Sequence, residues 1–374
     1  MKILVHYGYG KTGTTSLQFA LANKRKVLMQ HGVLYPKIVK PTMAHHLLQA
    51  LFKPEEETVP YLIADCGGYD AMVKLANQSW QKIKREVARK RPDVLLLSSE
   101  MFFGDATGLE QRKFHEMLSE LSDDIQPIVY VRDPAALYVS RLQQSSRNSG
   151  VVRRPSAEVI RNDIELIETA FGRKARIRAF QRSTLIGGDI VKDFTTSYLS
   201  DYLDPSLIPS ARENESISAE AMEMSVNLRR AVWPTENRVS FPKSHKLLSE
   251  IASMEAAYTD SSKPVLREGL ADQIRQASTD YIWLKETYGV SFDTLDYAKI
   301  DGTPVPYLTE YENLSGIIHV DWERYNQIIY SILSRQMDLA KEREFVVGNY
   351  NFKVSNISTN LRRLKKRALR LVGR

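Results

Sequence analysis

The chain of 374 residues contains a single cysteine, Cys66. One cysteine excludes an intramolecular disulfide and a zinc site built from several thiolates. The alternatives for Cys66 itself are a small buried hydrophobic residue and a nucleophile, and we favour the first because a free cysteine usually behaves as a small buried hydrophobe. A chain without disulfides suits a reducing compartment, so we expect a cytoplasmic protein.

Long hydrophobic runs are also lacking. Near the start only residues 3–5 are continuously apolar, fewer than the roughly 7 to 15 residues of a signal-peptide core. No window approaches the roughly 18 apolar residues of a membrane span, so we expect neither export nor an integral membrane protein. Glycine and proline are sparse, at 18 and 15 residues, while 43% of the chain is hydrophobic and 26% charged. This composition excludes a collagenous or disordered chain and is typical of a globular protein.

Most of the chain carries no net charge. The formal charge is +7, and residues 361–374 alone hold seven basic residues and no acidic one. A basic face on the folded protein would indicate a nucleic-acid partner, but positive charge confined to one end of the chain does not. Leu361, Leu364, Ala368 and Leu371 recur at helical spacing, which predicts a short basic amphipathic helix. Its alternatives are a solvated, docked terminus and a tether to anionic lipid or to an anionic glycan precursor.

Short apolar runs alternate with helical patterns along the first half of the chain. All-apolar strands between helices predict a parallel sheet covered on both faces, which is a three-layer α/β fold. The expected strands are 3–5, 94–98, 128–131 and 175–180. Helices are expected at 14–22, 70–91 and 109–121, and then mainly helical structure at 216–232, 264–288 and 322–345. We divide the chain into a core at 1–210, a helical part at 211–357 and a tail at 358–374.

A glycine-rich loop, HYGYGKTGTT at residues 6–15, stands between the first strand and the first helix. Consecutive backbone N–H groups and the positive end of a helix form a cradle for an anion, to which Lys11 adds a charge. The P-loop of nucleoside-triphosphate-binding proteins requires a glycine where this chain has Val5. The alternative is a loop with a purely structural role.

The run KTGTTSL at residues 11–17 resembles the 5′-phosphosulfate loop of sulfotransferases that use 3′-phosphoadenosine 5′-phosphosulfate (PAPS), where K-[TS]-G-[TS]-[TS] is typical. Many members carry proline before the lysine, where this chain has glycine. The resemblance implies that the loop binds the phosphosulfate. The residues it assigns to the donor are Gly10, Lys11, Thr12, Gly13, Thr14, Thr15 and Ser16.

A second motif follows the apolar run 128–131. Arg132-Asp133-Pro134 comes directly after it, at the carboxyl end of a strand, where open α/β sheets bind ligands. Ser140 stands eight residues after the arginine. In the sulfotransferase family this pattern holds the 3′-phosphate, and a guanidinium and a serine hydroxyl suit phosphate oxygens. The alternative for Arg132 is a salt bridge at the strand end, with Asp133 or Glu100.

A looser resemblance to bacterial members extends over roughly the first 235 residues. It includes residues 180–182, 185–194 and 214–218. The last of these also reads as a helix N-cap formed by Ser216 or Ser218, an interpretation that we favour over substrate contact.

Sulfuryl transfer needs an in-line nucleophile, a base and positive charge on the transferring group. Lys11 supplies charge, and the candidate bases are Glu100, His46 and His45, in that order. Between the two cofactor motifs, some carbohydrate sulfotransferases use a histidine as the base and others a glutamate. A further helix is expected at residues 43–49, and adjacent residues on it point about 100° apart, so at most one of the two histidines faces the site. The alternatives are a salt bridge of Glu100 with Lys11 or Arg132 and packing or capping by the histidines.

The sequence therefore predicts a fold of P-loop nucleotide-binding type with a helical C-terminal extension that helps to shape the acceptor site. The predicted activity is PAPS-dependent sulfuryl transfer, with adenosine 3′,5′-bisphosphate as product and no metal. The expected acceptor is a hydroxyl of a carbohydrate, glycoconjugate or glycolipid, and the tail predicts peripheral membrane contact. The alternatives are an ATP-dependent small-molecule kinase, with Asp133 or Glu100 on magnesium, and a non-catalytic membrane-associated nucleotide-binding scaffold.

Overall fold

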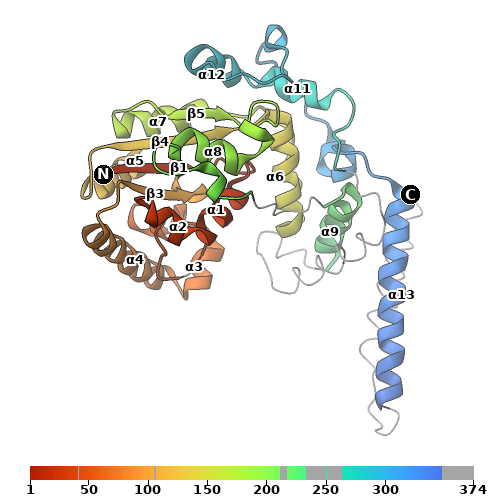
Figure 1. Ribbon diagram of the computed structural model, residues 1–374. Helices are drawn as coiled ribbons and strands as arrows, with labels where there is room; N and C mark the ends of the chain where they lie inside the picture. Colours follow the sequence, from red (N-terminus) through yellow and green to blue (C-terminus); the bar gives the residue numbers. More distant parts are fainter. Residues whose placement is uncertain (41, 105–106, 211–216, 233–250, 252–262, 348–374) are drawn as a thin grey trace.

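The computed structural model describes residues 1–40, 42–104, 107–210, 217–232, 251 and 263–347. Its centre is a sheet of five parallel strands in the order β2-β3-β1-β4-β5 (Figure 1). The strands are β1 (Lys2–Tyr7), β2 (Val33–Leu34), β3 (Val94–Ser99), β4 (Ile125–Val131) and β5 (Arg176–Ala179). The parallel sheet predicted from the apolar runs is confirmed. β2 was not predicted because two residues leave no periodic signal.

Helices connect the strands and extend beyond the last one. Those of the first half are α1 (Thr14–Asn23), α2 (Arg25–Gln30), α3 (Pro60–Cys66), α4 (Tyr69–Lys90), α5 (Leu109–Ser119), α6 (Pro134–Asn148), α7 (Arg161–Phe171) and α8 (Ile190–Leu199). In the described residues of the second half they are α9 (Ala219–Val232), α11 (Leu270–Ala277), α12 (Asp280–Tyr288) and α13 (Trp322–Val347). Two short 3-10 helices bear on the site, η1 (His46–Leu51) and η3 (Glu100–Phe102).

Helices flank both faces of the sheet. Alternate residues of β1 point to opposite faces, so Ile3, Val5 and Tyr7 join a core with α4, α5 and α7, whereas Leu4 joins one with α1, α2 and α8. Every residue of β3 and β4 is buried. Burial on both faces explains why these strands read as continuous apolar runs.

The strand order reverses at β1. After β1 the chain moves toward β2, and after β4 it moves toward β5, so the carboxyl ends of the adjacent strands β1 and β4 form a switch point. Tyr7 is in register with Ser99 of β3 and Val129 of β4. The segments that follow these strands therefore leave the sheet at the same edge.

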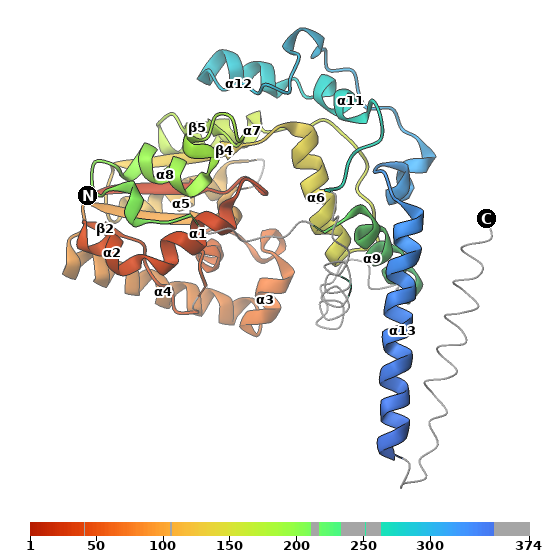
Figure 2. The ribbon, with the colours of Figure 1, turned by 45° about the vertical axis from the view of Figure 1, so that its right-hand side comes forward.

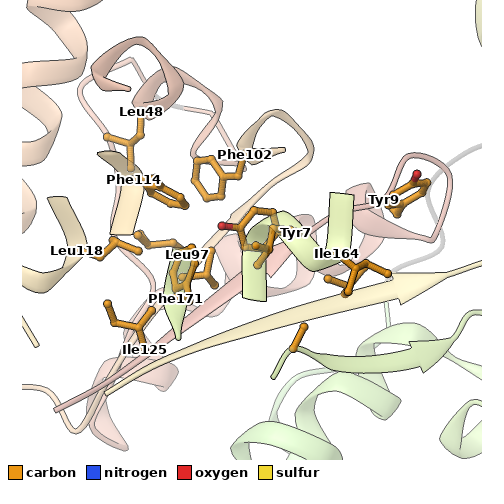
Figure 3. Packing of buried hydrophobic residues seen from close by; sticks show 14 of the residues in the cluster. Tyr7, Tyr9, Leu48, Leu97, Phe102, Phe114, Leu118, Ile125, Ile164 and Phe171 are labelled. Carbon is orange, nitrogen blue, oxygen red and sulfur yellow. The ribbon is translucent and has the colours of Figure 1, made fainter. Parts of the chain in front are cut away.

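An aromatic cluster packs around Tyr7, at the end of β1 on this edge (Figure 3). The Tyr7 ring makes edge contacts with Phe102, Phe114 and Phe171, at centroid distances of 6.2 to 6.4 Å. The Tyr7 hydroxyl donates a hydrogen bond to Oε1 of Gln111 over 2.8 Å. The last residue of β1 is thus fixed by packing and by a buried polar contact, which gives the following loop a rigid base.

A separate hydrophobic cluster holds the helical second half together. It joins α6 and α9 with α11 and the beginning of α13, including Tyr138, Met222, Ile274 and Ile328. Helix α6 stands between the sheet and α9, and α13 projects beyond them (Figure 2). Helix α6 therefore links the edge that carries Arg132 to the helical part of the chain.

The single helix expected at 264–288 was wrong. The structure has α11 and α12 there, separated at Ser278 and Thr279, and Leu266 instead forms an antiparallel bridge with Ile318. The Ser278 hydroxyl donates to the Ile274 carbonyl and accepts from the Glu158 amide, at 2.7 and 3.0 Å. A serine that bonds to the backbone in this way competes with the helix and ends α11.

Other expectations have mixed outcomes. Ser218 accepts a hydrogen bond from the Ala221 amide over 3.2 Å, as the predicted cap of α9. The boundary near residue 211, the segment 214–216 and the tail 358–374 lie outside the described residues. Among the helices that the structure describes, none is long and apolar enough to cross a membrane.

Candidate anion-binding and catalytic site

The glycine-rich loop after β1 follows an unusual backbone path. Lys11 and Gly13 both have positive φ, at 72° and 74°, on either side of Thr12. A lysine in this region is uncommon and costs energy, which points to a functional constraint on the loop. The Thr12 hydroxyl is fully buried and donates a hydrogen bond to the Tyr9 carbonyl over 2.6 Å, so it holds the loop from inside.

The loop amides face no acceptor. Throughout the described part of the chain, no hydrogen bond is made by the backbone N–H groups from residue 10 to residue 15. Gly13 precedes α1, a helix of ten residues, and Thr14, Thr15 and Ser16 form its first turn. Successive unpaired amides at a helix N-terminus, in a loop of positive φ values, form a cradle for an anion. All seven residues that the sequence assigns to the donor lie in this cradle or in the first turn of α1.

Gly13 is also a point of close approach. A Cβ atom added there would lie 2.8 Å from Cε2 of Phe180 and 3.0 Å from Cγ2 of Ile190. The Phe180 ring in turn lies under the guanidinium of Arg132, with Cζ 5.7 Å from the ring centroid. Phe180 therefore packs against the loop and supports the arginine, which brings the two sequence motifs together.

Arg132 contacts the loop directly. Its Nη1 donates a hydrogen bond to the Lys11 carbonyl over 3.0 Å. Burial lowers the pKa of Arg132, and neighbouring Asp133 opposes this. In the described residues no carboxylate lies within ion-pair distance of Arg132, so the salt bridge weighed as its alternative role is not formed there. Ser140 lies half-buried on α6 without a hydrogen-bond partner among these residues.

The Lys11 ammonium lies among other charged groups. Burial lowers its pKa, and the cations Arg147 and Arg132 act in the same direction, while Glu100 opposes them. The sequence reasoning missed Arg147. It stands seven residues after Ser140 on α6, about two turns on the same face, and that spacing was a usable signal. Cationic groups therefore converge on the loop.

Glu100 lies beside the loop as the start of η3, directly after β3. A Cβ atom at Gly8 would lie 2.6 Å from Oγ1 of Thr14 and 2.9 Å from Cγ of Glu100, so only glycine lets these side chains meet. Burial raises the pKa of Glu100, against the opposing effects of Lys11 and of a hydrogen bond with Thr14. A carboxylate with a raised pKa is a better proton acceptor than an ordinary one.

His45 is held in the interior. Its exposed fraction is 1%, and it precedes η1 instead of lying on the helix that we expected. The Ser98 amide donates to its Nδ1 over 3.0 Å, and its Nε2 lies 3.0 Å from the Pro36 carbonyl. Both ring nitrogens are therefore engaged with backbone, and burial lowers the pKa of His45 to about 4. Through these two contacts His45 joins β3 to the segment after β2.

His46 is oriented differently. Its Nδ1 lies 2.7 Å from the Ser99 hydroxyl, next to Glu100 in sequence, and the side chain is half-buried. Burial lowers the pKa of His46 to about 4, which makes it neutral but weakly basic near pH 7. His6 is fully buried, with Nδ1 2.8 Å from the Ser98 hydroxyl. Glu100 is therefore the candidate base with the most favourable environment.

Asp133 belongs to the scaffold of the site. Its Oδ1 accepts from the Ala136 amide over 2.7 Å, and its Oδ2 accepts from Arg275 and Thr294. Three donors leave this carboxylate little capacity for a metal ion. The described residues also contain no group of three or more His, Cys, Asp or Glu side chains arranged to hold one.

Comparisons of the chain with models of protein families, with curated proteins and with solved structures find no match in any of the three.

Proposed function

We propose that the chain is a sulfotransferase that moves a sulfuryl group from PAPS to an acceptor hydroxyl. One observation carries the proposal: the unpaired amides of residues 10–15, with Lys11 among them, lie against Arg132 at one edge of the sheet. An anion cradle and a separate guanidinium suit a nucleotide with negative charge at two positions. PAPS, the donor that the resemblance to sulfotransferases implies, is such a nucleotide.

In this proposal the loop amides and Lys11 hold the 5′-phosphosulfate. Lys11 neutralises the oxygen that bridges phosphorus and sulfur, whose charge grows as the S–O bond breaks. Arg132 and Ser140 hold the 3′-phosphate. Arg132 gives one of its N–H donors to the loop, and its remaining donors suit phosphate oxygens.

Glu100 is the proposed base. The acceptor oxygen forms a bond to sulfur as the bond from sulfur to the bridging oxygen breaks, and Glu100 takes the proton of the hydroxyl. The products are the sulfated acceptor and adenosine 3′,5′-bisphosphate. Burial keeps the pKa of Glu100 raised, so the carboxylate gains proton affinity while Lys11 still favours its ionised form. His46 is the second candidate, because Ser99 orients it beside the same strand end.

We also propose that the fold is of the P-loop nucleotide-binding type. The support is the central position of β1, which leads directly into the anion loop and α1. A kinase with the same architecture would need carboxylates for magnesium. Asp133 is engaged by three donors, which leaves Glu100 as the remaining candidate for that role and counts against a pair of magnesium carboxylates here.

The acceptor and the location of the protein are proposals that rest on the sequence alone. A carbohydrate or glycolipid hydroxyl follows from the resemblance to carbohydrate sulfotransferases. Peripheral membrane contact follows from the basic tail, whose seven cations would favour an anionic surface.

Calorimetric titration tests the proposed function. Adenosine 3′,5′-bisphosphate should bind the full chain without metal, and ATP with magnesium should not compete at similar concentration. Arg132→Ala should weaken the bisphosphate by about 10- to 100-fold and leave adenosine 5′-phosphate nearly unchanged. The matched control is Arg173→Ala, at the opposite end of β4, where Arg173 contacts Asp124 and the Ile125 carbonyl. Binding of ATP with magnesium alone would support the kinase, and binding of neither nucleotide would support a scaffold.

A further inference from the structure

The segment that contains α11 and α12 contacts Arg132 and Asp133 at three points. The Tyr281 hydroxyl donates a hydrogen bond to the Arg132 carbonyl over 2.6 Å. Arg275 Nε and the Thr294 hydroxyl both donate to Oδ2 of Asp133, over 3.0 and 2.7 Å. These donors come from about 140 to 160 residues later in the chain, and none was singled out by the sequence.

Arg132 is the first residue beyond the strand ladder. The last backbone contact of β4 on this side is from the Phe180 amide to the Val131 carbonyl, over 2.6 Å. Beyond that point the ladder no longer fixes the backbone. The Arg132 carbonyl instead accepts the hydrogen bond from the Tyr281 hydroxyl, and the side chain of Asp133 caps the N-terminus of α6. The direction in which the arginine leaves the sheet therefore depends on these contacts.

Helix α12 is anchored independently of Tyr281. Oδ2 of Asp280 accepts from the amides of Ile160 and Arg161, over 2.8 and 2.9 Å, at the start of α7. The Tyr281 ring is fully buried and packs against Phe292, with centroids 5.6 Å apart. Removal of the hydroxyl alone would leave the helix in place and release one carbonyl.

We propose that Tyr281, Arg275 and Thr294 are positioning residues that aim Arg132 at the 3′-phosphate of the nucleotide. The inference rests on the proposed function and adds part of the helical second half to the nucleotide site. A hydroxyl that holds the Arg132 carbonyl acts on the 3′-phosphate only through the arginine. Loss of the Tyr281 hydroxyl should therefore leave the loop amides and Lys11 in place.

The primary test compares Tyr281→Phe with Tyr288→Phe. Tyr288 lies on the same helix, and its hydroxyl donates to Oε1 of Glu168 over 2.8 Å, away from Arg132. Each variant loses one tyrosine hydroxyl and one hydrogen bond. Calorimetry should show about tenfold weaker binding of adenosine 3′,5′-bisphosphate to Tyr281→Phe, with adenosine 5′-phosphate changed less than about twofold. Tyr288→Phe should bind both nucleotides as the parent chain does.

A double-mutant cycle tests whether Tyr281 acts through the arginine. In the Arg132→Ala background, Tyr281→Phe should cause no further loss of bisphosphate affinity. Thr294→Val should weaken the bisphosphate selectively, and Thr294→Ser, which keeps the hydroxyl, should restore affinity. Additive losses in the cycle, or equal weakening of both nucleotides, would overturn the positioning role while the proposed function stands. Failure of the parent chain to bind the bisphosphate would overturn both.

Discussion

Replacement of Gly13 by alanine tests the geometry of the anion loop most directly. Gly13 has φ of 74°, where a residue with a Cβ atom costs about 1–2 kcal/mol. The added Cβ would also lie 2.8 Å from the Phe180 ring, and overpacking of this kind costs about 1–3 kcal/mol. We therefore expect Gly13→Ala to lower the free energy of unfolding by about 2–5 kcal/mol in total.

Gly269 provides a matched control. It also has φ of 74° and immediately precedes a helix, α11, but a Cβ atom there would meet nothing within 4 Å. Gly269→Ala should therefore lose only the conformational part, about 1–2 kcal/mol. The difference between the two variants isolates the contact with Phe180.

The same substitution should weaken nucleotide binding. To accept the new methyl group, the Phe180 ring must move, and Arg132 lies over that ring. Urea unfolding gives the stability of both variants, and calorimetry gives their affinity for adenosine 3′,5′-bisphosphate. If Gly13→Ala were no less stable than Gly269→Ala and bound the nucleotide equally well, the packing of the loop on Phe180 would be refuted.

Four further results are expected. Lys11→Ala should lower kcat by about 10² or more, with a smaller effect on product affinity, because in the proposed reaction the ammonium acts on charge that develops during transfer; near-normal kcat in a folded variant would remove the loop from the proposed mechanism. If Glu100 is the base, kcat should fall as the pH drops through its raised pKa, and Glu100→Gln should abolish that acidic limb; an unchanged profile would place the base elsewhere. Burial lowers the pKa of His45 to about 4, so the folded chain binds fewer protons than the unfolded one. Between pH 6.5 and 4 the parent should therefore lose about 3 kcal/mol relative to His45→Gln in urea unfolding, and a constant difference would contradict this. A chain that ends at Asn360 should sediment less than the full chain with anionic vesicles at low salt, and equal sedimentation would leave the tail without a tethering role.

The sequence predicted the elements whose surroundings are uniform. β3 and β4 are buried along their whole length, so each leaves an apolar run. The helix α4 has one buried stripe and 22 residues, enough to show its period. The break at Ser278 was missed because it depends on a hydrogen bond from Glu158, 120 residues away. Local pattern contains no information on such a partner.

The candidate site also contains some residues that the sequence indicated and others that only the structure revealed. The loop and Arg132 were found because each is a short motif at a strand end, where position alone brings them together. Phe180 lay in a stretch of looser resemblance, but its contact with Gly13 and Arg132 needed the structure. Tyr281 had no signal, since it bonds through a side-chain hydroxyl to a carbonyl 149 residues earlier. Residues that position a site from another part of the chain can be identified only after the chain is folded.

The charges at this edge explain why a nucleotide with two anionic groups would fit better than a single phosphate. Lys11 and Arg132 are partly buried, and no carboxylate in the described part of the chain lies within ion-pair distance of either. Burial of a cation without a partner is costly, and so is burial of unpaired amides. A phosphate in the loop would relieve the cost at Lys11 and the amides, but the guanidinium of Arg132, which contacts the Lys11 carbonyl and the Phe180 ring, would still lack an anionic partner. A second anionic group on the same ligand would relieve that cost too, without a further loss of translational freedom.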